Sequence, residues 1–172
     1  SIYSIPCEAH ASSSNETITS VTPLRVHKCW KRVCHATFTN LNNSTTTRSS
    51  LESTILIGAD VVGDATAYPI QTDESNTRLL LGHTASMLTG VHVTSPLGSS
   101  DGSGRRILTC DRDEKIRVSQ FPQTHAIHGF CLGHDTFVSA MDVVTQTNNG
   151  GEGEEDRNWC VSCGGDHTVR LW

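Results

Sequence analysis

The chain has 172 residues and a formal net charge of −5, and 35% of its residues are hydrophobic. This length suits one ordinary domain, while the negative charge opposes tight autonomous binding to nucleic acid, for which a basic face normally supplies most of the affinity. No stretch approaches the roughly 18 consecutive apolar residues of a membrane span, residues 1–15 lack the layout of a signal peptide, and seven cysteines is an odd number, so we expect a soluble intracellular protein with reduced thiols.

Short strand patterns separated by polar turns follow one another along the chain. A strand-like stretch at residues 2–5 is followed by a Ser-rich segment, and the next strand patterns are residues 34–38 and residues 56–68, the latter with a turn in its middle. Residues 107–119 and residues 160–172 then align with each other without a gap, and each indicates a strand, a tight turn and a second strand. Because the chain begins at Ser1 and stops directly after the last strand pattern, we expect it to be a piece of a longer protein.

A Gly-His pair precedes each of the two aligned segments, at residues 82–83 and residues 133–134. This is the Gly-His to Trp-Asp pattern of WD repeats, and residues 56–68 form a degenerate third copy. The sequence therefore predicts an all-β, WD-repeat β-propeller with about three four-stranded blades. Their approximate bounds are residues 27–78, 79–130 and 131–172, with residues 1–26 as a piece of an earlier blade. Closed propellers have about four to eight blades, so we expect a longer propeller, of seven blades.

The WD pattern predicts a buried polar network in each blade, because buried polar groups are hydrogen-bonded to one another. The last blade carries the full set of His134, Ser162, Asp166 and Trp172. The middle blade carries His83, Thr109 and Asp113. It has Ser119 where Trp is usual, so we expect its network to be incomplete. We interpret the two histidines as residues that hold the turns together, with no catalytic role.

Each predicted blade is longer than the usual blade length of about 40 to 45 residues. The excess falls between the first and second strands of each blade, at residues 40–52, 94–106 and 145–158. Equivalent loops of a propeller emerge on one face, so we expect these insertions to lie opposite the Gly-His and Asp turns. The Cys and His residues near position 30 lack the matched pairs of a zinc finger, so we expect no metal.

Residues 107–119, together with residues 121–122, 130–134 and 137–139, resemble the WD-repeat, non-catalytic subunit of the eukaryotic tRNA (guanine-N7)-methyltransferase, and residues 79–88 are similar to that family too. The resemblance implies a heterodimer in which a separate catalytic subunit binds S-adenosylmethionine and methylates a guanine in the variable loop of tRNA. This chain would hold no cofactor, would stabilise its partner and would help to position the tRNA. The expected location is the nucleus, with the cytoplasm as a second compartment.

The same resemblance implies that Arg117 pairs with a carboxylate of the catalytic subunit, with Lys115 and Arg112 close by. Strand alternation places Lys115 and Arg117 on the face opposite Ile116. One alternative is that Arg117 pairs within its own blade, where Arg170 holds the equivalent position. A second alternative is a general WD adaptor that recruits proteins to another assembly, such as a ubiquitin ligase, without RNA. A third, an autonomous metal-dependent enzyme, would require bound zinc.

Overall fold

The computed structural model describes residues 26–40, 54–70, 76–84, 86–96, 104–146 and 157–172. The chain divides into two compact units, residues 1–30 and residues 31–172, and every strand of the described residues lies in the second unit. None of the described residues belongs to a helix long and apolar enough to cross a membrane. The predicted piece of an earlier blade, residues 1–26, lies almost wholly outside the described residues.

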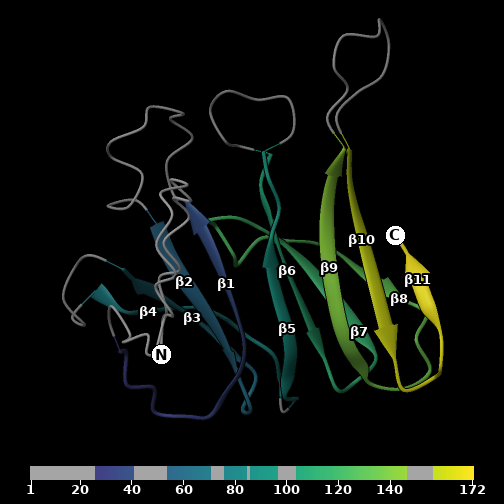
Figure 1. Cartoon of the computed structure of the whole chain (residues 1–172), viewed down its shortest axis with the longest axis horizontal. Coiled ribbons are helices and arrows are strands. Elements are labelled where there is room, and N and C mark those ends of the chain that lie inside the picture. The colour runs from purple at the N-terminus through teal and green to yellow at the C-terminus, as the bar shows by residue number, and fades with distance from the viewer. Residues whose placement is uncertain (1–25, 41–53, 71–75, 85, 97–103, 147–156) are drawn as a thin grey trace, which may run out of the picture. The chain divides into compact units, whose positions relative to one another are not determined.

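The second unit is built from three antiparallel sheets in which strands that follow one another in the chain are hydrogen-bonded neighbours (Figure 1). The first sheet consists of β1 (Val33–Asn40), β2 (Thr54–Asp60), β3 (Asp64–Pro69) and β4 (Arg78–Gly82). The second consists of β5 (Leu88–Val93), β6 (Arg106–Asp111), β7 (Lys115–Gln120) and β8 (Ile127–Leu132). The third consists of β9 (Val138–Gln146), β10 (Arg157–Gly164) and β11 (Val169–Leu171).

This arrangement agrees with the predicted all-β fold of propeller blades, with two differences. Among the described residues the third sheet has three strands instead of four. The predicted blade boundaries after residues 78 and 130 fall inside β4 and β8, each of which completes the sheet before it. The reason is that the histidine of each Gly-His pair comes after the last strand of one sheet and before the first strand of the next.

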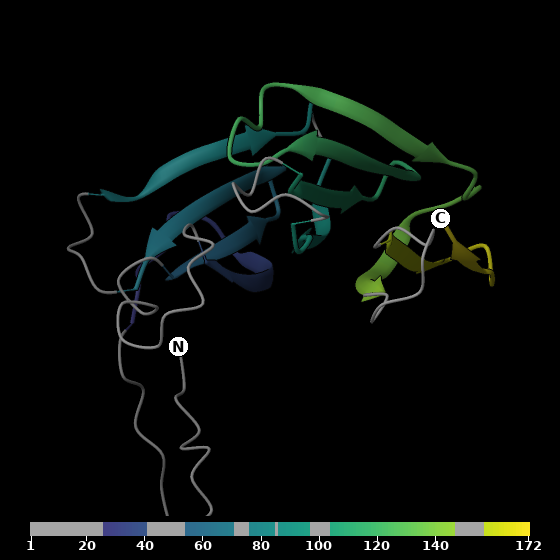
Figure 2. The same cartoon turned by 90° about the horizontal axis from the view of Figure 1, so that it is seen from above.

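The second sheet packs against both of its neighbours (Figure 2). Ile107 and Leu108 are adjacent in β6, so their side chains point to opposite faces. Ile107 lies in the apolar layer shared with the first sheet, and Leu108 lies in the layer shared with the third. The strand is therefore buried from Ile107 to Asp111, because both of its faces are covered.

The first strands of the three sheets are joined directly. The Thr89 hydroxyl of β5 donates to the Val138 carbonyl of β9 at 2.5 Å, and the Val91 N–H donates to His35 Nδ1 of β1 at 3.3 Å. The strands before and after each predicted insertion meet at one end of their sheet. The β2–β3, β6–β7 and β10–β11 turns lie at the other end (Figure 1). The insertions themselves lie largely outside the described residues.

Candidate partner-binding surface and blade networks

The last blade contains a continuous chain of buried hydrogen bonds. His134 Nδ1 lies 2.8 Å from Asp166 Oδ2, and His134 Nε2 lies 2.8 Å from Ser162 Oγ. The Trp172 indole N–H donates to the same hydroxyl at 2.9 Å. With a neutral imidazole protonated at Nδ1, the indole donates to Ser162, the hydroxyl to His134 and the imidazole to Asp166, so each group has a partner.

The Asp166 carboxylate is held in its ionised form by this network. Burial raises its pKa, but hydrogen bonds from His134, from the Thr168 hydroxyl and from two backbone N–H groups outweigh burial and place the pKa below the usual range. Arg170 Nη2 lies 3.3 Å from the same carboxylate. The His134 side chain is only 1% exposed, so no substrate reaches it. The geometry is that of a residue that holds the turns of the blade together, and not that of a catalytic base.

The middle blade has the same type of network, but with a different acid. His83 Nε2 lies 2.7 Å from Thr109 Oγ1, and His83 Nδ1 lies 2.8 Å from Asp111 Oδ2. Asp113, which the repeat alignment predicts in this position, is exposed. The prediction for Asp113 is therefore wrong, and Asp111 takes the role.

The local turn explains the change of residue. Asp111 ends β6, and its Oδ1 accepts the backbone N–H groups of Asp113 and Lys115, which directs Oδ2 toward the histidine. Asp60 holds the turn after β2 in the same way, by accepting the N–H groups two and four residues further on. The residue three positions after each of these aspartates has positive φ, 102° at Gly63 and 72° at Glu114. The recurrence of Asp three residues before a turn residue was the sequence signal that could have identified Asp111.

Arg117 makes three hydrogen bonds inside the protein. Its Nε donates to Ser119 Oγ at 2.9 Å, its Nη1 to the Gly82 carbonyl at 3.2 Å and its Nη2 to the Thr124 carbonyl at 3.2 Å. Partial burial lowers the pKa of Arg117, but the guanidinium stays charged because its reference value is about 12.5 or higher. The bonds to Ser119 and Thr124 favour the alternative in which Arg117 pairs within its own blade, and the bond to Gly82 extends this pairing to β4 of the first sheet.

Arg112 and Lys115 are exposed at the β6–β7 turn, and the structure shows no salt bridge for either among the described residues. Lys115 stands directly opposite Leu132 in the β7–β8 ladder, and Arg117 opposite Phe130. Directly opposed residues of an antiparallel pair share a face. Leu132 is 65% exposed and Phe130 is 49% exposed. We call Arg112, Lys115, Phe130 and Leu132 the rim surface. Sequence analysis missed its two apolar members, because apolar and polar residues do not alternate regularly in the sequence of β8.

The described residues contain no group of three or more His, Cys, Asp or Glu side chains that could hold a metal ion. Cys29 and Cys34, the two cysteines near position 30, are exposed and form no disulfide. Cys160 is buried and Cys163 is half-buried in β10.

Comparison with known proteins shows which family of WD-repeat proteins the chain is similar to. The model of the tRNA methyltransferase TRM82 WD40 domain matches residues 2–172. A relative called tRNA (guanine-N(7)-)-methyltransferase non-catalytic subunit wuho is 38% identical in Drosophila mojavensis over 121 residues, which is 70% of this chain and 27% of the relative. The Drosophila melanogaster protein of that name is 36% identical over 75% of this chain and 26% of its own length.

The mosquito Aedes aegypti has a protein of the same name that is 38% identical over 68% of this chain and 25% of the relative. The chain thus spans about a quarter of the length of the curated relatives it matches. The crystal structure of Saccharomyces cerevisiae Sqt1 aligns with 90% of this chain and 35% of that chain, with a TM-score of 0.51 and 11% identity. This last similarity concerns the fold alone.

Proposed function

Because the chain belongs to the tRNA methyltransferase TRM82 WD40 domain family, we propose that it is part of a non-catalytic scaffold subunit of a tRNA (guanine-N7)-methyltransferase. The subunit binds and stabilises a separate catalytic subunit and helps to position tRNA for methylation in its variable loop. The observation that carries the proposal is the 36–38% identity to relatives whose names state a non-catalytic methyltransferase subunit. A general WD adaptor without RNA is not favoured, because the same relatives name a different assembly.

The proposed division of labour places S-adenosylmethionine and the methyl transfer on the catalytic partner in a heterodimer. The buried histidines of this chain serve the blades, since each has two hydrogen-bonding partners inside its own network. A scaffold of this kind contributes by holding its partner in one conformation, which a rigid set of packed sheets is suited to do. The proposed location is the nucleus, which imaging of the tagged natural protein would test.

We assign the contact with the catalytic subunit to the rim surface. Its two cations are exposed and its two apolar side chains are uncovered, a mixture that suits a protein interface in which apolar contact is combined with charge complementarity. The chain as a whole is acidic, so a local group of cations distinguishes this surface. The matching segment of the partner is expected to present carboxylates beside apolar side chains.

Arg117 has an indirect part in this assignment. Its hydrogen bond to the Gly82 carbonyl ties β7 to β4 of the first sheet, its bonds to Ser119 and Thr124 stay within the middle blade, and β7 carries Lys115. Each of the two terminal nitrogens has one further N–H, so a partner carboxylate can still approach. Arg117→Leu is therefore expected to lower both the stability of the sheets and the assembly, and not assembly alone.

The test is co-purification of the full-length protein with the catalytic methyltransferase subunit, followed by an assay of guanine-N7 methylation on tRNA. Lys115→Glu reverses an exposed charge at the rim surface, and Arg157→Glu makes the same change at an exposed position of β10. We expect Lys115→Glu to lose at least tenfold of the recovered partner and activity while both variants stay folded by circular dichroism. Equal recovery with both variants would exclude the rim surface, and recovery of no methyltransferase by the wild type would refute the scaffold function itself.

A further inference from the structure

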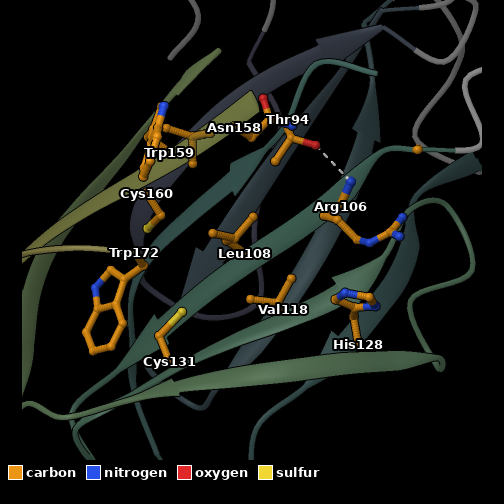
Figure 3. Close-up of a pocket in the computed structure, with 12 residues that line it drawn as sticks. Thr94, Arg106, Leu108, Val118, His128, Cys131, Asn158, Trp159, Cys160 and Trp172 are labelled. Carbon is orange, nitrogen blue, oxygen red and sulfur yellow. Dashed lines mark hydrogen bonds between the residues drawn. The ribbon is translucent and has the colours of Figure 1, made fainter. Parts of the chain in front are cut away.

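A cavity of about 310 Å³ lies between the second and third sheets (Figure 3). Its wall is largely apolar and includes Leu108, Val118, Cys131 and Cys160, with the rings of Trp159 and Trp172. Ligand sites in proteins usually measure about 300 to 1,000 Å³. The cavity is therefore large enough for one small ring system and little more.

The two thiols add to the apolar character of the wall. Burial raises the pKa of Cys131, and burial, together with nearby Cys131 and Cys110, raises the pKa of Cys160 to about 12. Both side chains are thus neutral thiols at physiological pH, and free thiols of this kind behave as small hydrophobic groups. The wall offers no negative charge to a ligand.

The charge of the cavity is positive and lies on one side. Figure 3 shows Arg106 and His128 together on the side opposite Trp159, Cys160 and Trp172. The only hydrogen bond from the Arg106 guanidinium within the described part of the chain goes to the Arg105 carbonyl, at 3.0 Å. His128 is exposed, and no described residue bonds its imidazole. The lining residues that the structure describes include no Asp or Glu.

The Asn158 and Thr94 side chains of the wall are already partly engaged within the protein. The Asn158 side chain donates to the Ser95 carbonyl at 3.3 Å and accepts from the Thr145 hydroxyl at 2.6 Å. Thr94 Oγ1 accepts the backbone N–H of Arg106 at 2.9 Å. The charged hydrogen-bond donor that the described wall offers a ligand is therefore the Arg106 guanidinium, with the His128 imidazole on the same side.

The charge of the lining limits how much negative charge the ligand can carry. Among the described lining residues, Arg106 is the one Lys or Arg side chain. A single anionic group in direct contact with a guanidinium gains a charge-assisted hydrogen bond, so one carboxylate matches the charge that this lining offers.

We propose that this cavity binds a small aromatic carboxylate, with its ring against Leu108, Val118 and Cys131 and its carboxylate at Arg106 and His128. This inference is independent of the proposed methyltransferase role, because none of the rim-surface residues lines the cavity, and of the blade networks only Trp172 does. The ring would replace water on an apolar wall, and the carboxylate would supply the acceptor that the guanidinium lacks.

The probe is naphthalene-2-carboxylate, titrated into the full-length protein by isothermal calorimetry with its neutral carboxamide as the matched ligand. We expect saturable binding of the carboxylate below 1 mM, on the order of the affinities of small ligands, and at least tenfold weaker binding of the carboxamide. A hydrogen bond to a charged group contributes about 1.5 to 3 kcal/mol, so Arg106→Gln should weaken the carboxylate by about tenfold to a hundredfold. Arg157→Gln, which removes a cation outside the lining, should leave binding unchanged.

A second variant keeps the test decisive if Arg106→Gln does not fold. Val118→Phe fills the cavity without altering its charge, and we expect it to abolish binding. No binding of the probe by the wild type, equal affinity for the carboxamide, or equal losses in Arg106→Gln and Arg157→Gln would each overturn the proposal. Displacement of the probe by a short single-stranded RNA at lower concentration than the probe itself would also overturn it, because it would favour a polyanionic ligand.

Discussion

Replacement of Asp111 by alanine should destabilise the middle blade far more than replacement of Asp113, although the repeat alignment predicts the opposite. The Asp111 side chain is 3% exposed and accepts hydrogen bonds from His83 and from the backbone N–H groups of Asp113 and Lys115. A buried donor left without an acceptor costs about 1 to 3 kcal/mol. Because water can reach the exposed turn and satisfy its two N–H groups, we count mainly the buried imidazole and expect a loss of about 1 to 3 kcal/mol.

Asp113→Ala serves as the matched control, because the two residues lie in the same turn and lose the same atoms. The Asp113 side chain is exposed, and exposed substitutions outside special features change stability by about 0.5 kcal/mol or less. The assay is urea-induced unfolding of the full-length protein at pH 7, followed by circular dichroism, with the denaturant slope compared between variants. A larger loss for Asp113→Ala than for Asp111→Ala would refute the hydrogen-bond assignment and restore the role that the alignment predicted.

Trp172→Phe keeps most of the ring packing but removes the N–H that donates to Ser162, so we expect a loss of about 1 kcal/mol in free energy of unfolding, measured by urea titration. Gly63→Ala should lower the free energy of unfolding by more than about 1 kcal/mol, the strain of an unfavourable backbone, because φ is 102° and a Cβ would lie 2.5 Å from the Ser86 carbonyl oxygen. Gly129→Ala, whose Cβ meets open space, is the control, and the melting temperatures of the two variants would be compared. Burial raises the pKa of Asp111, but the bonds from His83 and two backbone N–H groups outweigh it and lower that pKa. The ionised Asp111 side chain therefore contributes to stability above its pKa in the unfolded chain, about 3.9, and this contribution is lost as the pH falls through the pKa in the folded protein. Below about pH 5, the urea midpoint of Asp111→Ala should consequently depend less on pH than that of the wild type.

The sequence was sufficient to predict the strand–turn–strand units, because they depend on local alternation and on turn residues. It was not sufficient to predict which sheet the fourth strand joins. Residues 78–82 pair with β3 and not with β5, yet nothing local in Leu79 or Leu80 distinguishes the two partners. Strand pairing depends on contacts with residues distant in the chain, whereas the alignment compares residues one by one.

The exchange between Asp111 and Asp113 has a similar cause at a smaller scale. Thr109 and Ser162 are equivalent both in the alignment and in their bonds to histidine, so a gapless comparison carries the equivalence forward to Asp113 and Asp166. The backbone of the β6–β7 turn instead follows that of the β2–β3 turn. Which acid reaches the imidazole is decided by the turn conformation, and a comparison of side-chain types does not contain that information.

The missing tryptophan and the engaged arginine of the middle blade are two parts of one arrangement. In the last blade the indole of Trp172 bonds Ser162, and Arg170 bonds Asp166. In the middle blade Ser119 stands at the tryptophan position, is fully buried and accepts from Arg117. The small side chain is compatible with a guanidinium that also reaches carbonyls of the neighbouring segments. Arg117 therefore helps to replace the connection that the indole provides elsewhere, and Lys115 is the better residue with which to probe contact with a partner.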